Sequence, residues 1–290
     1  MILLIIILNL SLLVFLLLRN KNSSIFNRHT ILRFLLLILF GGIACVISLI
    51  IEYFSTFLLI SFFSDGYSIV NNKVYWDNSF NEILYNFIFC FIIVGIIEEL
   101  TKILPVFFYN KRCLFYHNDL KKFDFIIPFL IVGMTFSIIE DVEYIMNGDE
   151  WTGFARLITE FCGHTLYALL IGVGYYKSSV KAKATSLSFS LRMKKVPDIK
   201  FISGMKSKNI FAVSCIIIIF IHGLYDFLVY TFIDLAFIFI ALSLIYFIVF
   251  LIMLRNTNFK DDYIKRFLKD NKHLTKEEVE CLIDEHEIKI

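Results

Sequence analysis

The sequence predicts an all-α, polytopic transmembrane helix bundle of about seven spans, with a short cytoplasmic C-terminal helix. The 290 residues are 58% hydrophobic and have a mean hydropathy of +0.75, which is well above the usual composition of a soluble domain. Several stretches of about 20 residues almost lack charge, and a helix of that length can cross a ~30 Å hydrocarbon layer. Loops rich in basic residues also alternate with loops that have few, as a membrane protein of fixed orientation requires.

The predicted elements follow from the apolar runs. The seven predicted spans cover residues 2–18, 31–51, 82–108, 123–146, 154–176, 210–232 and 235–254. The first run lacks the basic region and cleavage site of a signal peptide, so we expect it to be a retained span. Residues 53–63 are apolar but short, and they either extend the second span or lie at the interface. Residues 1–254 would form one bundle, whose motif-bearing core is 82–232.

Loop charge predicts the orientation of this bundle. Basic residues gather in loops 19–33, 109–122 and 177–209, whereas loop 64–79 has one and loop 147–153 has none. Because cytoplasmic loops are enriched in Lys and Arg, the N-terminus is predicted outside and the C-terminus in the cytoplasm. Abundant Phe, Ile and Asn are typical of an AT-rich bacterial genome, so we expect a multi-pass protein of a bacterial cell membrane. The net charge of +2 gives no indication of a nucleic-acid partner.

Two polar segments complete the chain. Residues 255–290 are predicted to be a soluble cytoplasmic tail, in which Thr275 and Glu278 form a capping box that begins a short helix. We expect this helix to pack on the bundle or on a partner. Residues 177–209 are rich in Lys and Ser, and we interpret them as a mobile loop near anionic headgroups.

Four predicted spans carry ionisable side chains that a lipid-facing helix does not need. A charge in the middle of a membrane costs about 3 kcal/mol on insertion scales, so such residues indicate a function or a paired structural role. From the third span to the sixth they are Glu98, Glu99 and Lys102; Glu140, Asp141 and Glu143; Arg156, Glu160 and His164; and His222 and Asp226.

Spacing and depth suggest that these groups share one site. Glu98 with Lys102, and His222 with Asp226, are four residues apart and therefore lie on one helix face. Glu98, His164 and His222 lie about 12 or 13 residues from the cytoplasmic ends of their spans, and Glu140 about 17, which corresponds to depths of roughly 18–26 Å. We therefore expect four helices to bring carboxylates and imidazoles around one water-accessible cavity.

Such a cavity favours hydrolysis. A carboxylate can take a proton from water, and an aspartate one turn from a histidine holds the imidazole in a defined tautomer. His222, His164 and Glu140 could also bind zinc with one position open for water. The chain has no HExxH motif, and a zinc site and a metal-free site remain alternatives at this point.

Structural explanations compete with these roles. Arg156 and Glu160 could form an intrahelical pair near the outer interface, and Lys102 could be a structural counter-ion of Glu98 or Glu99. His164 alone would more often be a hydrogen-bonded packing residue than a ligand. The Glu98–Glu99 doublet and the His222–Asp226 pair are harder to explain by packing.

Three short motifs resemble those of a known family. Glu98-Glu99-Leu100-Thr101-Lys102 is an EExxK motif, Phe136 to Glu140 an FxxxE motif, and His222 to Asp226 an HxxxD motif. In this order, each on its own span, they resemble the PrsW family of bacterial intramembrane proteases, which is similar in turn to the CAAX-prenyl-protease and bacteriocin-immunity superfamily.

The resemblance implies cleavage of a membrane-anchored protein, such as a single-span anti-sigma factor. It implies that Glu98 and Glu99 activate the attacking water, that His222 binds metal or stabilises the oxyanion, and that Glu140 and Asp226 complete the site. Lys102, Phe136, His164 and Arg156 would support them. Glu140 stands where CAAX-type relatives carry histidine, which leaves fewer of the usual zinc ligands, and Asp141 and Glu143 are outside the motifs.

Two other functions are compatible with intramembrane charges. A proton- or ion-coupled transporter uses carboxylates and histidines as relays, although transporters of this kind usually show repeated halves, and this sequence shows no repeat. A scaffold or immunity protein without catalytic activity is the other alternative. The substrate, the trigger and the oligomeric state do not follow from the sequence.

Overall fold

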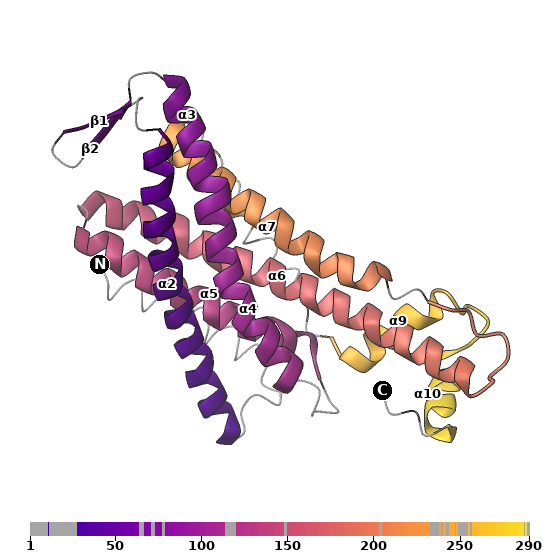
Figure 1. Cartoon of the computed structure of the whole chain (residues 1–290). Helices are drawn as coiled ribbons and strands as arrows, with labels where there is room; N and C mark the ends of the chain where they lie inside the picture. Colours follow the sequence, from indigo (N-terminus) through magenta and orange to yellow (C-terminus); the bar gives the residue numbers. More distant parts are fainter. Residues whose placement is uncertain are drawn as a thin grey trace.

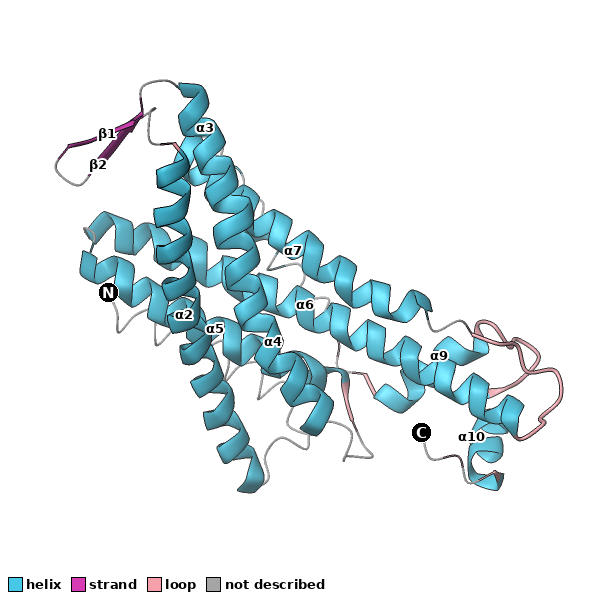
Figure 2. Ribbon diagram, viewed as in Figure 1, coloured by secondary structure: helices cyan, strands magenta, loops and turns pink. Residues whose placement is uncertain are grey.

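The computed structural model describes residues 28–63, 67–70, 73–76, 79–113, 120–147, 150–202, 205–232 and 257–286, with scattered single positions elsewhere. These residues form a helical bundle (Figures 1 and 2), which confirms the predicted fold class. Of the predicted span 2–18 the structure describes a single residue, and most of the predicted span 235–254 also lies outside the described residues.

Helix α5 (Lys122–Asn147) is the centre of the bundle. It packs against α2 (Arg28–Phe62), α4 (Gly95–Cys113) and α6 (Glu150–Met193). Its side chains Phe123, Ile126 and Leu130 are fully buried in the main hydrophobic cluster. A helix that is apolar on all sides is expected at such a position, because every face meets protein.

Helices α2 and α7 (Met205–Thr231) cover the outside. They expose large apolar side chains such as Leu39, Phe57, Ile216 and Phe220, and an apolar surface of this extent fits lipid better than water.

Three described helices are long and apolar enough to cross a membrane, namely Leu32–Phe62, Lys122–Met146 and Asn209–Thr231. Helix α2 runs without a break through residues 53–62, so this segment extends the predicted second span.

The predicted third span is a continuous helical run in three parts. It consists of α3 (Ser79–Ile88), a π-helical turn η2 (Phe89–Val94) and α4. Pro105 lies inside α4 and does not end it. A π turn admits an extra residue into the helix and so rotates the face that follows, which is why such turns are common beside functional residues. Here the turn ends four residues before Glu98.

The sequence-based interpretation of 177–209 as a loop is wrong for 177–193, because α6 continues to Met193. Ala184, Leu187, Ser188 and Leu191 are completely buried and follow the i, i+3, i+4, i+7 pattern, which gives this extension one inner face. Helix α9 (Phe259–Leu268) packs on α6. The extension is therefore held by tertiary contacts, despite its polar composition.

The tail joins the bundle. Phe259 of α9 stacks near Phe125 of α5, with ring centroids 4.7 Å apart, and its backbone N–H donates to the carbonyl of Leu120 at 2.9 Å. The predicted capping box is confirmed: Thr275 and Glu278 make reciprocal hydrogen bonds at the start of α10 (Lys276–Glu285). The buried side chains of both tail helices belong to the same cluster as those of α5 and α6.

The loop expected at 64–79 contains a small hairpin. Strands β1 (Tyr67–Val70) and β2 (Lys73–Trp76) pair antiparallel, from Tyr67 opposite Trp76 to Val70 opposite Lys73. β-Branched and aromatic residues on both sides of Asn71-Asn72 carried this signal in the sequence. The hairpin joins α2 to α3 at one end of the bundle (Figure 1).

Candidate active site

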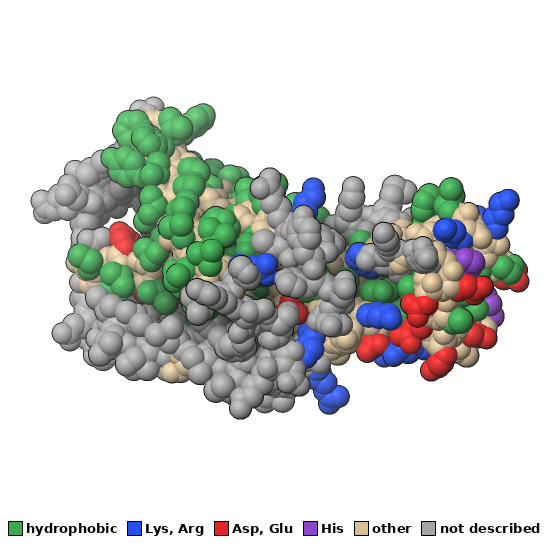
Figure 3. Space-filling view, turned by 90° about the horizontal axis from the view of Figure 1, so that it is seen from below, with side chains coloured by type: hydrophobic (Ala, Val, Ile, Leu, Met, Phe, Trp, Pro, Cys, Tyr) green, Lys and Arg blue, Asp and Glu red, His purple; other side chains and the backbone are tan. Residues whose placement is uncertain are grey.

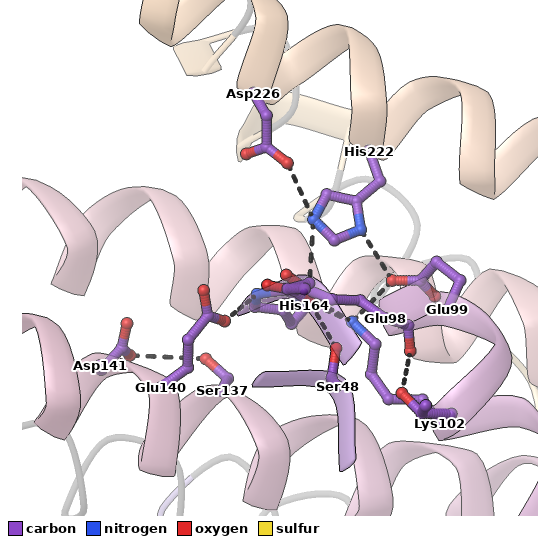
Figure 4. A network of polar contacts seen from close by, with 12 residues as sticks. Ser48, Glu98, Glu99, Lys102, Ser137, Glu140, Asp141, His164, His222 and Asp226 are labelled. Carbon is purple, nitrogen blue, oxygen red and sulfur yellow. Dashed lines mark hydrogen bonds and ion pairs between the residues drawn. The ribbon is translucent and has the colours of Figure 1, made fainter. Parts of the chain in front are cut away.

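The ionisable residues of α4, α5, α6 and α7 meet inside the bundle (Figure 4). Glu98, Glu99 and Lys102 come from α4, Glu140 from α5, His164 from α6, and His222 and Asp226 from α7. The first six side chains belong to residues that are at most 8% exposed. The predicted convergence therefore occurs, but in a closed, tightly packed arrangement.

Two glycines bring the motifs of α4 and α7 together. A Cβ on Gly223, next to His222, would lie 2.8 Å from the Cα of Phe91 and 2.9 Å from the carbonyl of Cys90. A Cβ on Gly95 would lie 3.0 Å from the carbonyl of Ile219. The two backbones thus touch where a side chain would separate them. Their contact sets the distance between the EExxK and HxxxD motifs.

Lys102 lies at the centre of the network. Its Nζ is 2.7 Å from Oε1 of Glu99, 3.2 Å from Oε2 of Glu98 and 3.1 Å from Nδ1 of His164. A lysine ammonium has three N–H donors and no acceptor, so all three donors have a partner. The ammonium also lies 4.2 Å from the centre of the Phe136 ring, a cation–π contact.

The partners of His164 define its tautomer. Because Lys102 can only donate, Nδ1 of His164 must accept. The other nitrogen, Nε2, then carries the proton and donates to Oε2 of Glu140 at 2.9 Å. Glu140 thus orients an imidazole whose Nδ1 lone pair faces the α4 motif, as a carboxylate does for a histidine ligand.

His222 is surrounded by carboxylates. Its Nδ1 lies 2.9 Å from Oε1 of Glu99, while its Nε2 lies 3.4 Å from Oδ2 of Asp226 and 3.8 Å from Oε2 of Glu98. The ring also packs near Tyr167 and His164, with centroids 5.2 Å from each. Nδ1–H therefore donates to Glu99, and Nε2 faces the space between Glu98 and Asp226.

The donor set suits a divalent metal. One ligand atom from each of Glu98, His164 and His222 lies within 4.8 Å of the others, and two imidazoles with one carboxylate are a common zinc-binding combination. The carboxylate that groups with both imidazoles in this way is Glu98, whereas the sequence favoured Glu140. The ammonium of Lys102 donates a hydrogen bond to the Nδ1 lone pair of His164. A metal ion that used Nδ1 as a ligand would therefore compete with this ammonium.

Sequence reasoning missed a contribution from α2. Ser48 is fully buried and its hydroxyl donates to Glu52. Glu52 interacts electrostatically with Glu140 and Lys102. The signal was present, because Glu52 is the only charged residue between Arg33 and Phe63, but the predicted second span ends at residue 51.

Three further predicted residues do not take part in the described contacts around Lys102 and His222. Asp141 is fully buried and accepts a hydrogen bond from Ser137 at 3.4 Å. Arg156 and Glu160 belong to α6, but their side chains lie outside the part that the structure describes.

Comparison with known proteins agrees with the geometry. A family model described as PrsW family intramembrane metalloprotease matches residues 30–254. This range includes all but the first two residues of α2 and the whole of α4, α5, α6 and α7, which contribute to the site. No curated protein and no solved structure matches the chain.

Proposed function

The chain belongs to the PrsW family of intramembrane metalloproteases, and from this premise we propose that it cleaves a single-span membrane protein with water activated by Glu98. A regulator such as an anti-sigma factor fits this substrate class. We place the protein in a bacterial cell membrane. Its N-terminus would be outside and its C-terminus in the cytoplasm, because basic residues gather in the segments 19–33, 109–122 and 177–209.

The observation that carries the proposal is the contact between the two strongest motifs. His222 of α7 and Glu99 of α4 are 123 residues apart in the chain, yet their side chains lie 2.9 Å apart in a buried site. A carboxylate–imidazole pair of this kind orients the imidazole and fixes its proton. No lipid-facing helix requires it.

Glu98 is the better placed of the two glutamates to act as the base. Both Lys102 and His222 hold Oε1 of Glu99, at 2.7 and 2.9 Å, so this oxygen is already occupied as an acceptor. Glu98 has one lysine contact, at 3.2 Å, and its Oε2 faces Nε2 of His222 at 3.8 Å. A water between these groups would lose its proton to Glu98.

The proposed reaction adds water across a peptide bond. The water oxygen bonds to the scissile carbonyl carbon, the C–N bond breaks, and the proton held by Glu98 passes to the leaving nitrogen. Lys102 offsets part of the negative charge of the glutamate pair. Glu140 holds His164, and Asp226 faces the second nitrogen of His222, so both imidazoles keep their orientation during the reaction.

If the chain holds a zinc ion, Glu98, His164 and His222 would be its ligands. When bound, the ion would lower the pKa of a water molecule and polarise the substrate carbonyl. Glu99 and Glu140 would then orient the two histidines.

Membrane proteomics tests the proposal and identifies the substrate in the same experiment. Protein termini are compared in cells that carry the wild type, Glu98→Gln or Glu82→Gln. Glu82 is an exposed acid on α3 and serves as the matched control. We expect a single-span protein to be truncated with the wild type and the control, and intact with Glu98→Gln. Identical termini in all three would contradict the proposal.

A further inference from the structure

A basic cavity lies away from the intramembrane site. Its volume is about 760 Å³, and it is formed where the extension of α6, the segment after α6 and the end of α9 meet. Five cationic side chains line it, together with one carboxylate, that of Asp270; the cations are Lys181, Lys200, Arg266, Lys269 and Lys272. Figure 3 shows charged side chains gathered at this end of the molecule, in contrast to the apolar bundle.

Buried polar side chains fix one wall of the cavity. Asn271 is fully buried, and its Oδ1 accepts a hydrogen bond from the backbone N–H of Lys200 at 2.6 Å. The hydroxyl of Ser188, also fully buried, donates to the carbonyl of Lys200 at 2.9 Å, and it accepts from the N–H of Ile202 at 3.2 Å. The backbone that carries Lys200 is thus attached both to α6 and to the turn after α9. The cavity wall is built before any ligand binds.

The charge of the cavity is not neutralised by its own acid. Asp270 pairs with Arg266, with Nη1 and Oδ2 3.0 Å apart, and it is the only carboxylate among the lining residues. Lys200, Lys269 and Lys272 are exposed. Several positive side chains around a concave wall create a strong local electrostatic potential, which attracts an anion into the cavity. The size of the cavity is in the usual range for small-molecule sites.

We propose that this cavity binds a phosphate-bearing anion. Lysine ammonium and arginine guanidinium groups are the usual partners of phosphate, and several of them around one concave wall suit a compact group with several oxygens. Phe201 lines the same cavity with 54% of its surface exposed, which supplies an apolar side for whatever carries the phosphate. The inference does not depend on the peptidase function.

The phosphate can belong to a lipid headgroup or to a soluble molecule. Lys181 is only five residues beyond the predicted end of the fifth span at residue 176, about 7.5 Å along the helix. A headgroup is therefore within reach, and basic cavities at this depth bind anionic lipids elsewhere. A soluble phosphate compound would make the same contacts.

Binding of defined probes separates these sources. The purified full chain is tested with inorganic pyrophosphate in neutral detergent, and with phosphatidic acid in nanodiscs of phosphatidylcholine. The variant carries Lys200→Ala, Lys269→Ala and Lys272→Ala. The control carries Lys194→Ala, Lys260→Ala and Lys265→Ala, three exposed lysines outside the cavity. Thermal unfolding in detergent verifies that both variants are folded.

We expect saturable binding of at least one probe, weakened about tenfold or more in the cavity variant and less than about twofold in the control, because each ammonium removed from the cavity takes away a charge-assisted contact to the phosphate. Binding of pyrophosphate would identify a soluble ligand, and binding of phosphatidic acid alone a headgroup. Binding of neither probe would overturn the proposal. Equal loss in both variants, or equal affinity for a hexaglutamate peptide, would also overturn it.

Discussion

The imidazole of His222 donates from Nδ1 to Oε1 of Glu99 over 2.9 Å, and the same oxygen lies 2.7 Å from the ammonium of Lys102. One carboxylate oxygen thus connects α7 to the centre of α4. Glu99 is 1% exposed, so water does not screen these contacts. In the proposed mechanism the two acids of the doublet have different tasks: Glu99 positions His222 and Lys102, and Glu98 takes part in the reaction.

The closeness of α4 and α7 should depend on Gly223. We expect Gly223→Ala to push the helices apart, because its Cβ would lie 2.8 Å from the Cα of Phe91. Overpacking of this kind costs typically 1–3 kcal/mol. Thermal unfolding and cleavage should both be impaired. Gly42→Ala is the matched control, since its Cβ meets only the Cδ1 of Ile139 at 3.5 Å, and equal behaviour of the two variants would refute the contact's role.

Lys102 should hold the acidic network together. We expect Lys102→Met to destabilise the protein by about 3–5 kcal/mol, because it leaves buried glutamates without their cation. Adding Glu98→Gln and Glu99→Gln to this variant should restore much of the stability while cleavage stays absent. Thermal unfolding in detergent measures both effects, and Lys111→Met, at an exposed position of α4, is the control. A stable Lys102→Met protein would show that the lysine is not the counter-ion.

Metal dependence can be measured independently of the substrate. If the protein binds zinc, its ligand atoms come from Glu98, His164 and His222, which lie within 4.8 Å of one another, so His164→Ala and His222→Ala should lose the metal. Glu98 would then act as a ligand, and a chelator should abolish cleavage until Zn²⁺ is added back. Metal-free protein that cleaves at the full rate would show that Glu98 acts as the base without a metal.

The residues of the candidate site could be predicted from the sequence because each is marked by features of its own segment. An ionisable residue inside an apolar run stands out, and the i,i+4 spacing of His222 and Asp226 places both on one face. The pairing of Glu99 with His222 could not be predicted from such features. It depends on the π turn before Gly95, which sets the direction of the α4 side chains, and on the contact between backbones at Gly223.

Two differences separate the predicted and the observed helices. The predicted second span ends at residue 51 and so excludes Glu52, although the apolar run continues to residue 63. In residues 177–193, the abundance of Lys and Ser favours a loop, so composition outweighs the helical spacing of the buried residues there. Ala184, Leu187 and Leu191 form a helical stripe in the sequence, but the partner that covers it, α9, is more than 60 residues further along the chain.

Cleavage by the purified enzyme tests the central claim most directly. The wild type, Glu98→Gln and Glu82→Gln are reconstituted in liposomes with the single-span protein that membrane proteomics identifies. We predict that Glu98→Gln lowers the cleavage rate by about 10²–10⁴-fold, the usual contribution of a general base, while Glu82→Gln cleaves like the wild type. A Glu98→Gln enzyme that is folded and cleaves within about twofold of the wild-type rate would contradict the account, because that residue could not then be the base.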